Sequence, residues 1–165
     1  MSKVLYPGTF DPVTLGHLSV INACSRMFDE VIVGVLVNPE KKPLFALDDR
    51  VKMIEVAMRR ATIPNTFVYT SDQLAVEVAR HFGAGTIARS IRLHMDFEAE
   101  LVMSFNNAIL APEIQTIWVS PSQELLHISS SAVRELVRRG AFEKLDQYLP
   151  ENVVDYIRQL QAGSV

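Results

Sequence analysis

The segment from Tyr6 to His17 carries residue types that suit the binding of a phosphate group. Gly8 and Gly16 allow the backbone to approach a ligand closely, and Thr9 offers a hydroxyl group and a backbone N–H. His17 stands at the expected start of a helix, where free N–H groups and the positive end of the helix dipole attract anions. A histidine at this place can donate a hydrogen bond to an oxygen that gains negative charge.

The glycine spacing in this segment does not fit the dinucleotide-binding fingerprint, which excludes that motif. Taken alone, the short pattern Thr-x-Gly-His has a second interpretation that is about equally good. In that interpretation Gly8 and Gly16 only serve turns, and His17 is a solvated residue in the first turn of a helix.

Two arginines, Arg89 and Arg92, follow the strand-like run Thr86–Ala88 and stand three residues apart. Each guanidinium can form a bidentate pair with a phosphate. The alternative is an exposed pair of arginines in salt bridges with Asp96 or Glu98, which is a common surface arrangement. Without further context the two interpretations carry about the same weight.

Two lysines and a group of serines add further candidates. Lys41 and Lys42 directly follow the strand-like run Val31–Val37, a position that favours an anion contact for at least one of them, although adjacent lysines are usually solvated. Ser129–Ser131 contains good N-cap residues, and the free N–H groups of the helix that begins there also suit phosphates. The remaining histidines lack the spacing of metal ligands, so we expect no metal site built by the protein. They are His81, His94 and His127.

Short apolar runs alternate with helical patterns along the whole chain. The expected strands are Lys3–Tyr6, Val31–Val37, Thr66–Thr70, Thr86–Ala88 and Ile114–Ser120. The expected helices cover Leu18–Phe28, Leu47–Ala61, Leu74–Phe82 and Phe97–Leu110, then one that opens at Ser129–Ser131 and one with Pro150 in its first turn that ends near Gln161. This alternation predicts an α/β fold: a single doubly wound, Rossmann-like domain with a five-stranded parallel sheet and helices on both faces. Ligands of such folds bind at the carboxyl ends of the strands, where the candidate residues stand.

Length and composition limit the remaining options. A chain of 165 residues predicts one domain, here 1–161, with a short tail at 162–165. A net charge of −3 argues against binding of nucleic acid through bulk positive charge. One cysteine, Cys24, excludes an intrachain disulfide. We see no signal peptide and no run of roughly 20 apolar residues for a membrane, so we expect a cytoplasmic protein.

Four motifs in this sequence resemble those of one enzyme family. The loop motifs closely resemble the signature of the HxGH nucleotidyltransferases and, within them, the bacterial phosphopantetheine adenylyltransferases. All four occur in the order and at the spacing of the family, so the resemblance covers nearly the whole chain. They are Pro7–Pro12 with Thr14–His17, Lys41–Phe45, Asp96–Glu98 with Glu100, and Ile128–Ser131.

The sequence also departs from the family at three positions. Ser90 stands between the two arginines where the family carries glycine. If that backbone requires a positive φ, a Cβ there costs about 1–2 kcal/mol. Ala99 and Leu125 stand where many members carry an aromatic residue. We expect these changes to bear on affinity and regulation more than on the type of reaction.

The resemblance implies transfer of the adenylyl group from ATP to 4′-phosphopantetheine, which gives dephospho-coenzyme A and pyrophosphate, with Mg²⁺ bound to ATP. It further implies a homohexamer and possible feedback binding of coenzyme A. The implied catalytic residues are His17, Lys41 and Arg92. The implied phosphopantetheine contacts are Thr9, Lys41, Leu74, Ala75 and Arg89. The implied ATP contacts are Thr9, Phe10, His17, Ser90, Ile91, Arg92, Glu100, Leu125, Leu126, His127, Ile128, Ser129, Ser130 and Ser131.

Two alternatives stay open at this point. One is a related nucleotidyltransferase with another acceptor, such as nicotinate mononucleotide or a cytidylyl substrate, against which the Ile-Ser-Ser-Ser block and the Arg-x-x-Arg spacing argue. The other is a nucleotide-binding protein without turnover, for which Ser90, Ala99 and Leu125 are the only support. His17 and Lys41 argue against that second alternative.

Overall fold

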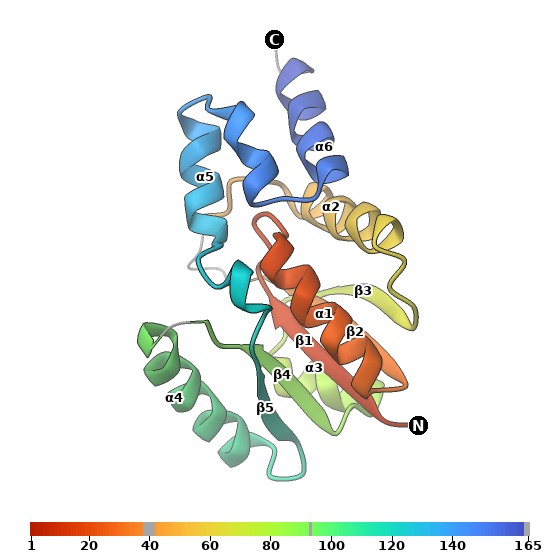
Figure 1. Ribbon diagram of the computed structural model, residues 1–165. Helices are drawn as coiled ribbons and strands as arrows, with labels where there is room; N and C mark the ends of the chain where they lie inside the picture. Colours follow the sequence, from red (N-terminus) through yellow and green to blue (C-terminus); the bar gives the residue numbers. More distant parts are fainter. Residues whose placement is uncertain (38–41, 93, 164–165) are drawn as a thin grey trace.

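The computed structural model describes residues 1–37, 42–92 and 94–163 (Figure 1). Five parallel strands form one sheet in the order β3-β2-β1-β4-β5. The strands are β1 (Lys3–Gly8), β2 (Glu30–Leu36), β3 (Thr66–Ser71), β4 (Thr86–Ser90) and β5 (Gln115–Val119). The chain builds outward from β1 on one side and then returns to build β4 and β5 on the other. The predicted doubly wound sheet is therefore confirmed, with its switch point between β1 and β4.

Six α-helices and two short 3₁₀ helices are present in the described part of the chain. They are α1 (Leu15–Met27), α2 (Leu47–Arg60), α3 (Ala75–Phe82), α4 (His94–Leu110), η1 (Gln123–Leu125), α5 (Ser130–Arg138), η2 (Phe142–Gln147) and α6 (Glu151–Ala162). A helix with the length and hydropathy of a membrane span is absent from the described residues. The helix ends lie within a few residues of the predicted ones, and Pro150 is the N-cap of α6 rather than a residue of its first turn.

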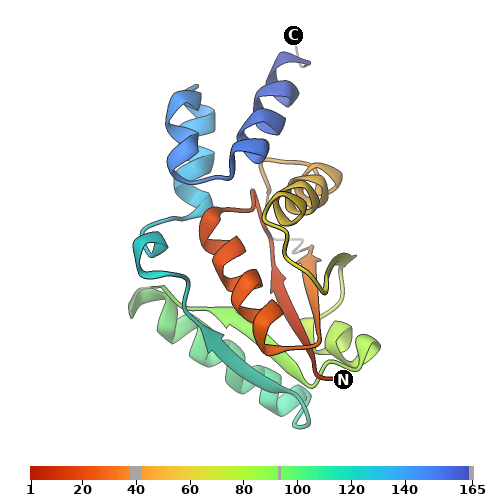
Figure 2. The same cartoon turned by 45° about the vertical axis from the view of Figure 1, so that its right-hand side comes forward.

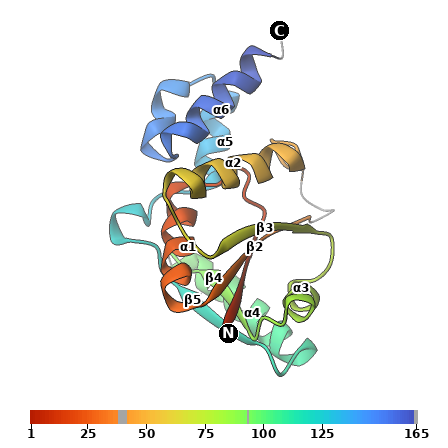
Figure 3. The ribbon, with the colours of Figure 1, turned by 90° about the vertical axis from the view of Figure 1, so that its right-hand side faces the viewer.

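Alternate residues of the central strand β1 point into two separate cores. Val4 and Tyr6 pack with α1, α2 and the C-terminal helices on one face of the sheet. Leu5 packs with α3 and with the segment between α4 and β5 on the other face. Figure 3 shows the two layers on opposite sides of the sheet. Because both faces are covered, the interiors of β1 and β2 are apolar on both sides of the strand, at Val4–Tyr6 and Val31–Val33, which is why these strands could be recognised in the sequence.

The C-terminal helices hold the starts of α1 and α2 in place (Figure 2). The backbone N–H of Leu15 donates to the carbonyl of Tyr148 at 2.9 Å. The phenol of Tyr156 on α6 donates to Asp49 on α2 at 2.9 Å. The α6 helix runs to Ala162, and the division into a domain at 1–161 and a tail stays a prediction.

Candidate active site

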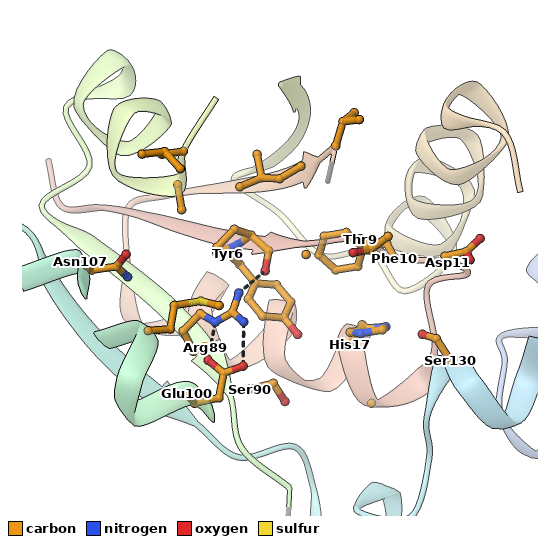
Figure 4. A pocket seen from close by; sticks show the side chains of 18 of the residues that line it. Tyr6, Thr9, Phe10, Asp11, His17, Arg89, Ser90, Glu100, Asn107 and Ser130 are labelled. Carbon is orange, nitrogen blue, oxygen red and sulfur yellow. Dashed lines mark hydrogen bonds and ion pairs between the residues drawn. The ribbon is translucent and has the colours of Figure 1, made fainter. Parts of the chain in front are cut away.

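A cavity of about 970 Å³ lies at the carboxyl ends of β1, β2 and β4 (Figure 4). The turn after β1, the first turns of α1, α3 and α5, and one face of α4 complete its wall. This is the edge of the sheet at which the topology of a doubly wound fold places a ligand. The candidate residues of the sequence therefore converge on one cavity from segments far apart in the chain.

The turn after β1 brings an aromatic ring back over the strand that precedes it. Phe10 is 2% exposed and has a positive φ of 48°. A Cβ on Gly8 would lie 2.9 Å from the Phe10 ring, so glycine is required for this close approach. The Phe10 ring also contacts the rings of Tyr6 and His17 edge to face, at centroid distances of 5.5 and 5.1 Å. Burial raises the pKa of the Tyr6 phenol, which therefore stays protonated.

His17 is fixed by the residue that caps its own helix. The backbone N–H of Thr14 donates to Nδ1 of His17 at 3.0 Å, and the N–H of His17 is 3.3 Å from the Thr14 hydroxyl. Because Nδ1 accepts this bond, the neutral ring carries its proton on Nε2. No described residue accepts that proton, and Nε2–H can donate into the cavity that His17 lines. Burial and then the charge of Arg92 lower the pKa of His17 to about 4. At neutral pH the ring is an uncharged hydrogen-bond donor.

The two arginines of the β4 exit are held in different ways. Nε and Nη2 of Arg89 donate to the two carboxylate oxygens of Glu100 at 2.6 and 2.7 Å, and Nη1 donates to the Pro7 carbonyl at 3.1 Å (Figure 4). Nη1 of Arg92 donates to the carbonyl of Ile128 at 2.7 Å. Both guanidinium groups line the cavity. The acidic partner of Arg89 is thus Glu100 on α4.

The start of α5 is tied to the turn that follows β1. Ser129 caps the helix, since its hydroxyl accepts the N–H of Ala132 at 3.2 Å, which is the ordinary role considered for this serine group. The Ser130 hydroxyl donates to the Pro12 carbonyl at 2.9 Å. Ser129, Ser130 and Ser131 all line the cavity. The free N–H groups of this helix start therefore face the same space as His17.

Comparison with known proteins identifies the family. The cytidylyltransferase-like family profile matches residues 5–136. The phosphopantetheine adenylyltransferase of Thermosynechococcus vestitus is 43% identical over 149 residues, which are 90% of this chain and 86% of the relative. The same enzyme of Gloeobacter violaceus is 41% identical over 160 residues, 97% of both chains. This chain belongs to the phosphopantetheine adenylyltransferase family.

A solved structure of more distant sequence agrees on the fold. The nicotinic acid mononucleotide adenylyltransferase of Plasmodium falciparum, in complex with NaAD, superposes with a TM-score of 0.74 over 97% of this chain and 96% of its own. Its sequence is only 13% identical, so the likeness concerns the fold alone. The Rossmann-like architecture and the nucleotidyltransferase family that the motifs indicated are both confirmed.

Most of the residues that the family resemblance implied line the cavity. These are Thr9, Phe10, His17, Leu74, Ala75, Arg89, Ser90, Arg92, Glu100, Ile128, Ser129, Ser130 and Ser131. Ile91, Leu125, Leu126 and His127 are not part of its wall. The last three belong to the segment around η1, which packs beside the start of α1, where the Leu125 carbonyl lies 3.8 Å from a Cβ placed on Gly16. Lys41 lies outside the described residues. The catalytic and binding roles of all these residues stay predictions.

One wall of the cavity, formed by a face of α4, was not predicted from the sequence apart from Glu100. Met103, Asn107 and Leu110 follow Glu100 on one face of α4 at helical spacing. Their spacing from Glu100 was a usable signal, but a stripe with Met and Leu also fits a helix face that packs on the core. Arg134, three residues after Ser131, also lines the cavity and donates to the Asp11 carbonyl at 2.8 Å.

Ser90 stands where the family carries glycine, and its backbone is not strained there. It is the last residue of β4, and the non-glycine residues with a positive φ in the described ranges are Phe10, Thr62 and Asn65. The conditional cost of 1–2 kcal/mol for a Cβ in the left-handed region therefore does not arise here. Its side chain lines the cavity.

Three acidic residues line the cavity, the exposed Asp72 and two whose carboxylates are engaged by the protein itself. Both oxygens of Glu100 pair with Arg89, and both carboxylate oxygens of Asp11 accept backbone N–H groups, from Leu44 at 2.8 Å and Phe45 at 2.9 Å. In the described ranges, no three His, Cys, Asp or Glu side chains gather in a way that could hold a metal ion. The residues present therefore fit a magnesium ion that arrives with a nucleotide and keeps phosphate and water as its ligands.

Proposed function

We propose that this chain transfers the adenylyl group of ATP to 4′-phosphopantetheine and releases dephospho-coenzyme A and pyrophosphate. The observation that carries the proposal is the neutral His17, held by Thr14 so that Nε2–H faces a cavity that is also lined by Arg89 and Arg92. Family membership supports the choice of substrates, because relatives that are 36% to 43% identical over nearly the whole chain are phosphopantetheine adenylyltransferases.

The chemistry requires little from the protein beyond alignment and charge stabilisation. A phosphate oxygen of the acceptor is already a nucleophile at neutral pH, so no general base is needed. That oxygen bonds to the α-phosphorus of ATP, the bond to the bridging oxygen breaks, and pyrophosphate leaves with the electron pair. Nε2–H of His17 donates to an α-phosphoryl oxygen as its charge grows. Thr9 orients the attacking phosphate.

The charged groups divide between the two substrates. Arg89 holds the phosphopantetheine phosphate, and Arg92 holds the phosphates of ATP together with the start of α5. Lys41 neutralises the phosphates during transfer. The apolar part of the cavity between α3 and α4, which includes Leu74, takes the pantetheine arm. When bound with ATP, Mg²⁺ neutralises phosphate charge, held by the nucleotide and water.

The proposal includes self-association and regulation. The outer side of α4 exposes apolar side chains: Val102 at 59%, Phe105 at 60% and Ile109 at 77%. Large exposed apolar surfaces of this kind are typical of protein interfaces. We propose that this face joins copies of the chain in a homohexamer, that coenzyme A binds in the same cavity as a feedback ligand, and that the enzyme works in the cytoplasm.

Pyrophosphate release tests the reaction directly. The purified chain is incubated with ATP, Mg²⁺ and one acceptor at a time: 4′-phosphopantetheine, nicotinate mononucleotide, or no acceptor. A cytidylyl reaction is tested with CTP in place of ATP. Release only with ATP and 4′-phosphopantetheine supports the proposal. Release with another pair would make the chain a related nucleotidyltransferase, and ATP binding without any release would make it a nucleotide-binding protein without turnover.

Replacing Phe105 and Ile109 together with serine should lower the oligomeric mass in solution, because the substitutions remove apolar area from the exposed face of α4. Light scattering coupled to size exclusion gives the mass. The matched control is Met27→Ser, which changes one apolar residue, 54% exposed, on α1 away from that face. A wild-type chain that runs as a monomer at micromolar concentration, or a double variant with unchanged mass, contradicts the interface.

A further inference from the structure

Arg50 is a fully charged side chain in an almost fully buried place. It belongs to α2, is 3% exposed and is not part of the cavity wall. Its Nη1 donates to the carbonyl of Thr9 at 2.8 Å, while its Nε is buried and has no hydrogen-bond partner among the residues that the structure describes. Burial lowers the pKa of the guanidinium, and the charge of Asp11 opposes that effect. Burial of an arginine with an unsatisfied donor lowers the stability of the folded state, and a well-packed apolar side chain at this position would stabilise the fold at least as well.

The residue that Arg50 holds is one that faces the substrates. The carbonyl of Thr9 points away from the cavity to Arg50, while Thr9 itself lines the cavity. Since one hydrogen bond fixes the plane of the peptide that follows Thr9, it also sets the course of the chain into Phe10. Phe10 has the positive φ that non-glycine residues adopt only where the surroundings hold them there. Arg50 supplies that hold from α2.

Asp11 fastens the same turn to the same part of the chain. Its carboxylate accepts the N–H groups of Leu44 and Phe45, which lie just ahead of α2, at 2.8 and 2.9 Å. Asp11 is 3% exposed. The segment from Leu44 to Arg50 therefore holds the turn at two points, one on each side of Phe10.

We infer that Arg50 is a positioning residue for adenylyl transfer, which acts through the carbonyl of Thr9 to keep the hydroxyl and N–H of that residue aimed at the substrate phosphates. The inference rests on the proposed function. It explains why α2 carries a buried charge behind the cavity. Displacement of a reacting group by about 1 Å can cost up to 10²-fold in rate, so a small relaxation of this turn suffices for a measurable effect.

The test compares Arg50→Met with Arg60→Met, a change of an exposed arginine on the same helix that pairs with Glu151. We expect Arg50→Met to lower kcat about tenfold with a smaller change in the KM for ATP, and Arg60→Met to leave kcat within about twofold. In a double-mutant cycle with Thr9→Ala, the Arg50 change should cost less than it does in the wild type, because the hydroxyl that Arg50 helps to aim is gone while the backbone N–H remains. Arg50→Lys, which keeps the charge and a donor, should recover part of the loss.

Amide hydrogen exchange gives a readout that needs no substrate. The amides of Gly8, Thr9, Phe10 and Asp11 should exchange faster in Arg50→Met than in wild type, and not in Arg60→Met. Any one of three results overturns the inference. They are a normal kcat in Arg50→Met, kcat effects of the two single variants that fully multiply in the double variant, and unchanged amide exchange in the turn after β1. If Arg50→Met does not fold, Arg50→Lys carries the same cycle and the same exchange measurement. Absence of pyrophosphate release by the wild type instead overturns the proposed function, while the exchange result still decides whether Arg50 holds the turn.

Discussion

Replacement of His17 with alanine should lower kcat about 10²–10³-fold while the fold survives, as removal of one oxyanion donor does in other enzymes. The ring is neutral at physiological pH because burial and Arg92 lower its pKa to about 4. His17 therefore contributes one aligned N–H donor to the reaction, and not a positive charge. The bond from the Thr14 N–H fixes the tautomer and the direction of that group at no further cost when substrates bind. Initial rates at saturating ATP and 4′-phosphopantetheine give kcat.

Two further variants separate this role from a structural one. His17→Gln keeps a side-chain N–H of similar reach and should recover part of the lost rate. His81→Ala removes an exposed histidine of α3 that is not part of the cavity wall. Its ring stacks on Tyr69 at a centroid distance of 6.0 Å, and its loss should leave kcat unchanged. Near-normal turnover of His17→Ala would remove His17 from the reaction. A fall in the melting temperature without a fall in kcat would make it only a helix-capping partner.

The sequence was sufficient to predict the sheet and the edge at which most of the candidate residues meet. Val4 and Leu5 belong to different cores, and a strand buried on both faces is apolar at both parities, which a reader of the sequence can see. Once the strands were known, parallel topology required that their carboxyl ends lie at one edge. His17 and Arg89 were therefore predicted to meet, although 72 residues separate them in the chain.

The partners of the site residues could not be predicted in the same way. The sequence suggested Asp96 or Glu98 as acidic partners for the arginines, but Arg89 pairs with Glu100. That choice depends on the rotation of α4 about its own axis, which apolar periodicity leaves open when both sides of the helix carry apolar residues. The bond between Arg50 and the Thr9 carbonyl depends likewise on how α2 crosses the turn after β1.

Replacement of Glu100 with alanine should raise the KM for 4′-phosphopantetheine about 30-fold and change the KM for ATP by less than about threefold. Glu100 takes Nε and Nη2 of Arg89, which leaves N–H groups on the far edge of the guanidinium for a phosphate. Hydrogen bonds of this charged kind contribute about 1.5–3 kcal/mol each, and their loss frees the guanidinium to adopt other rotamers. Steady-state kinetics with each substrate varied in turn separates the two KM values.

The same variants decide between two roles for Glu100. If it acts by holding Arg89, then Glu100→Ala should cost almost nothing in an Arg89→Ala background, because the group it orients is gone. If instead its carboxylate contacts the sugar or adenine of ATP, the KM for ATP rises and the two changes multiply. Glu98→Ala, an exposed carboxylate on the same helix, controls for the loss of one negative charge from α4. Since both oxygens of Glu100 pair with Arg89, we expect the first outcome, in place of the ATP contact that the family resemblance implied for Glu100. In that outcome α4 supports the phosphopantetheine phosphate site.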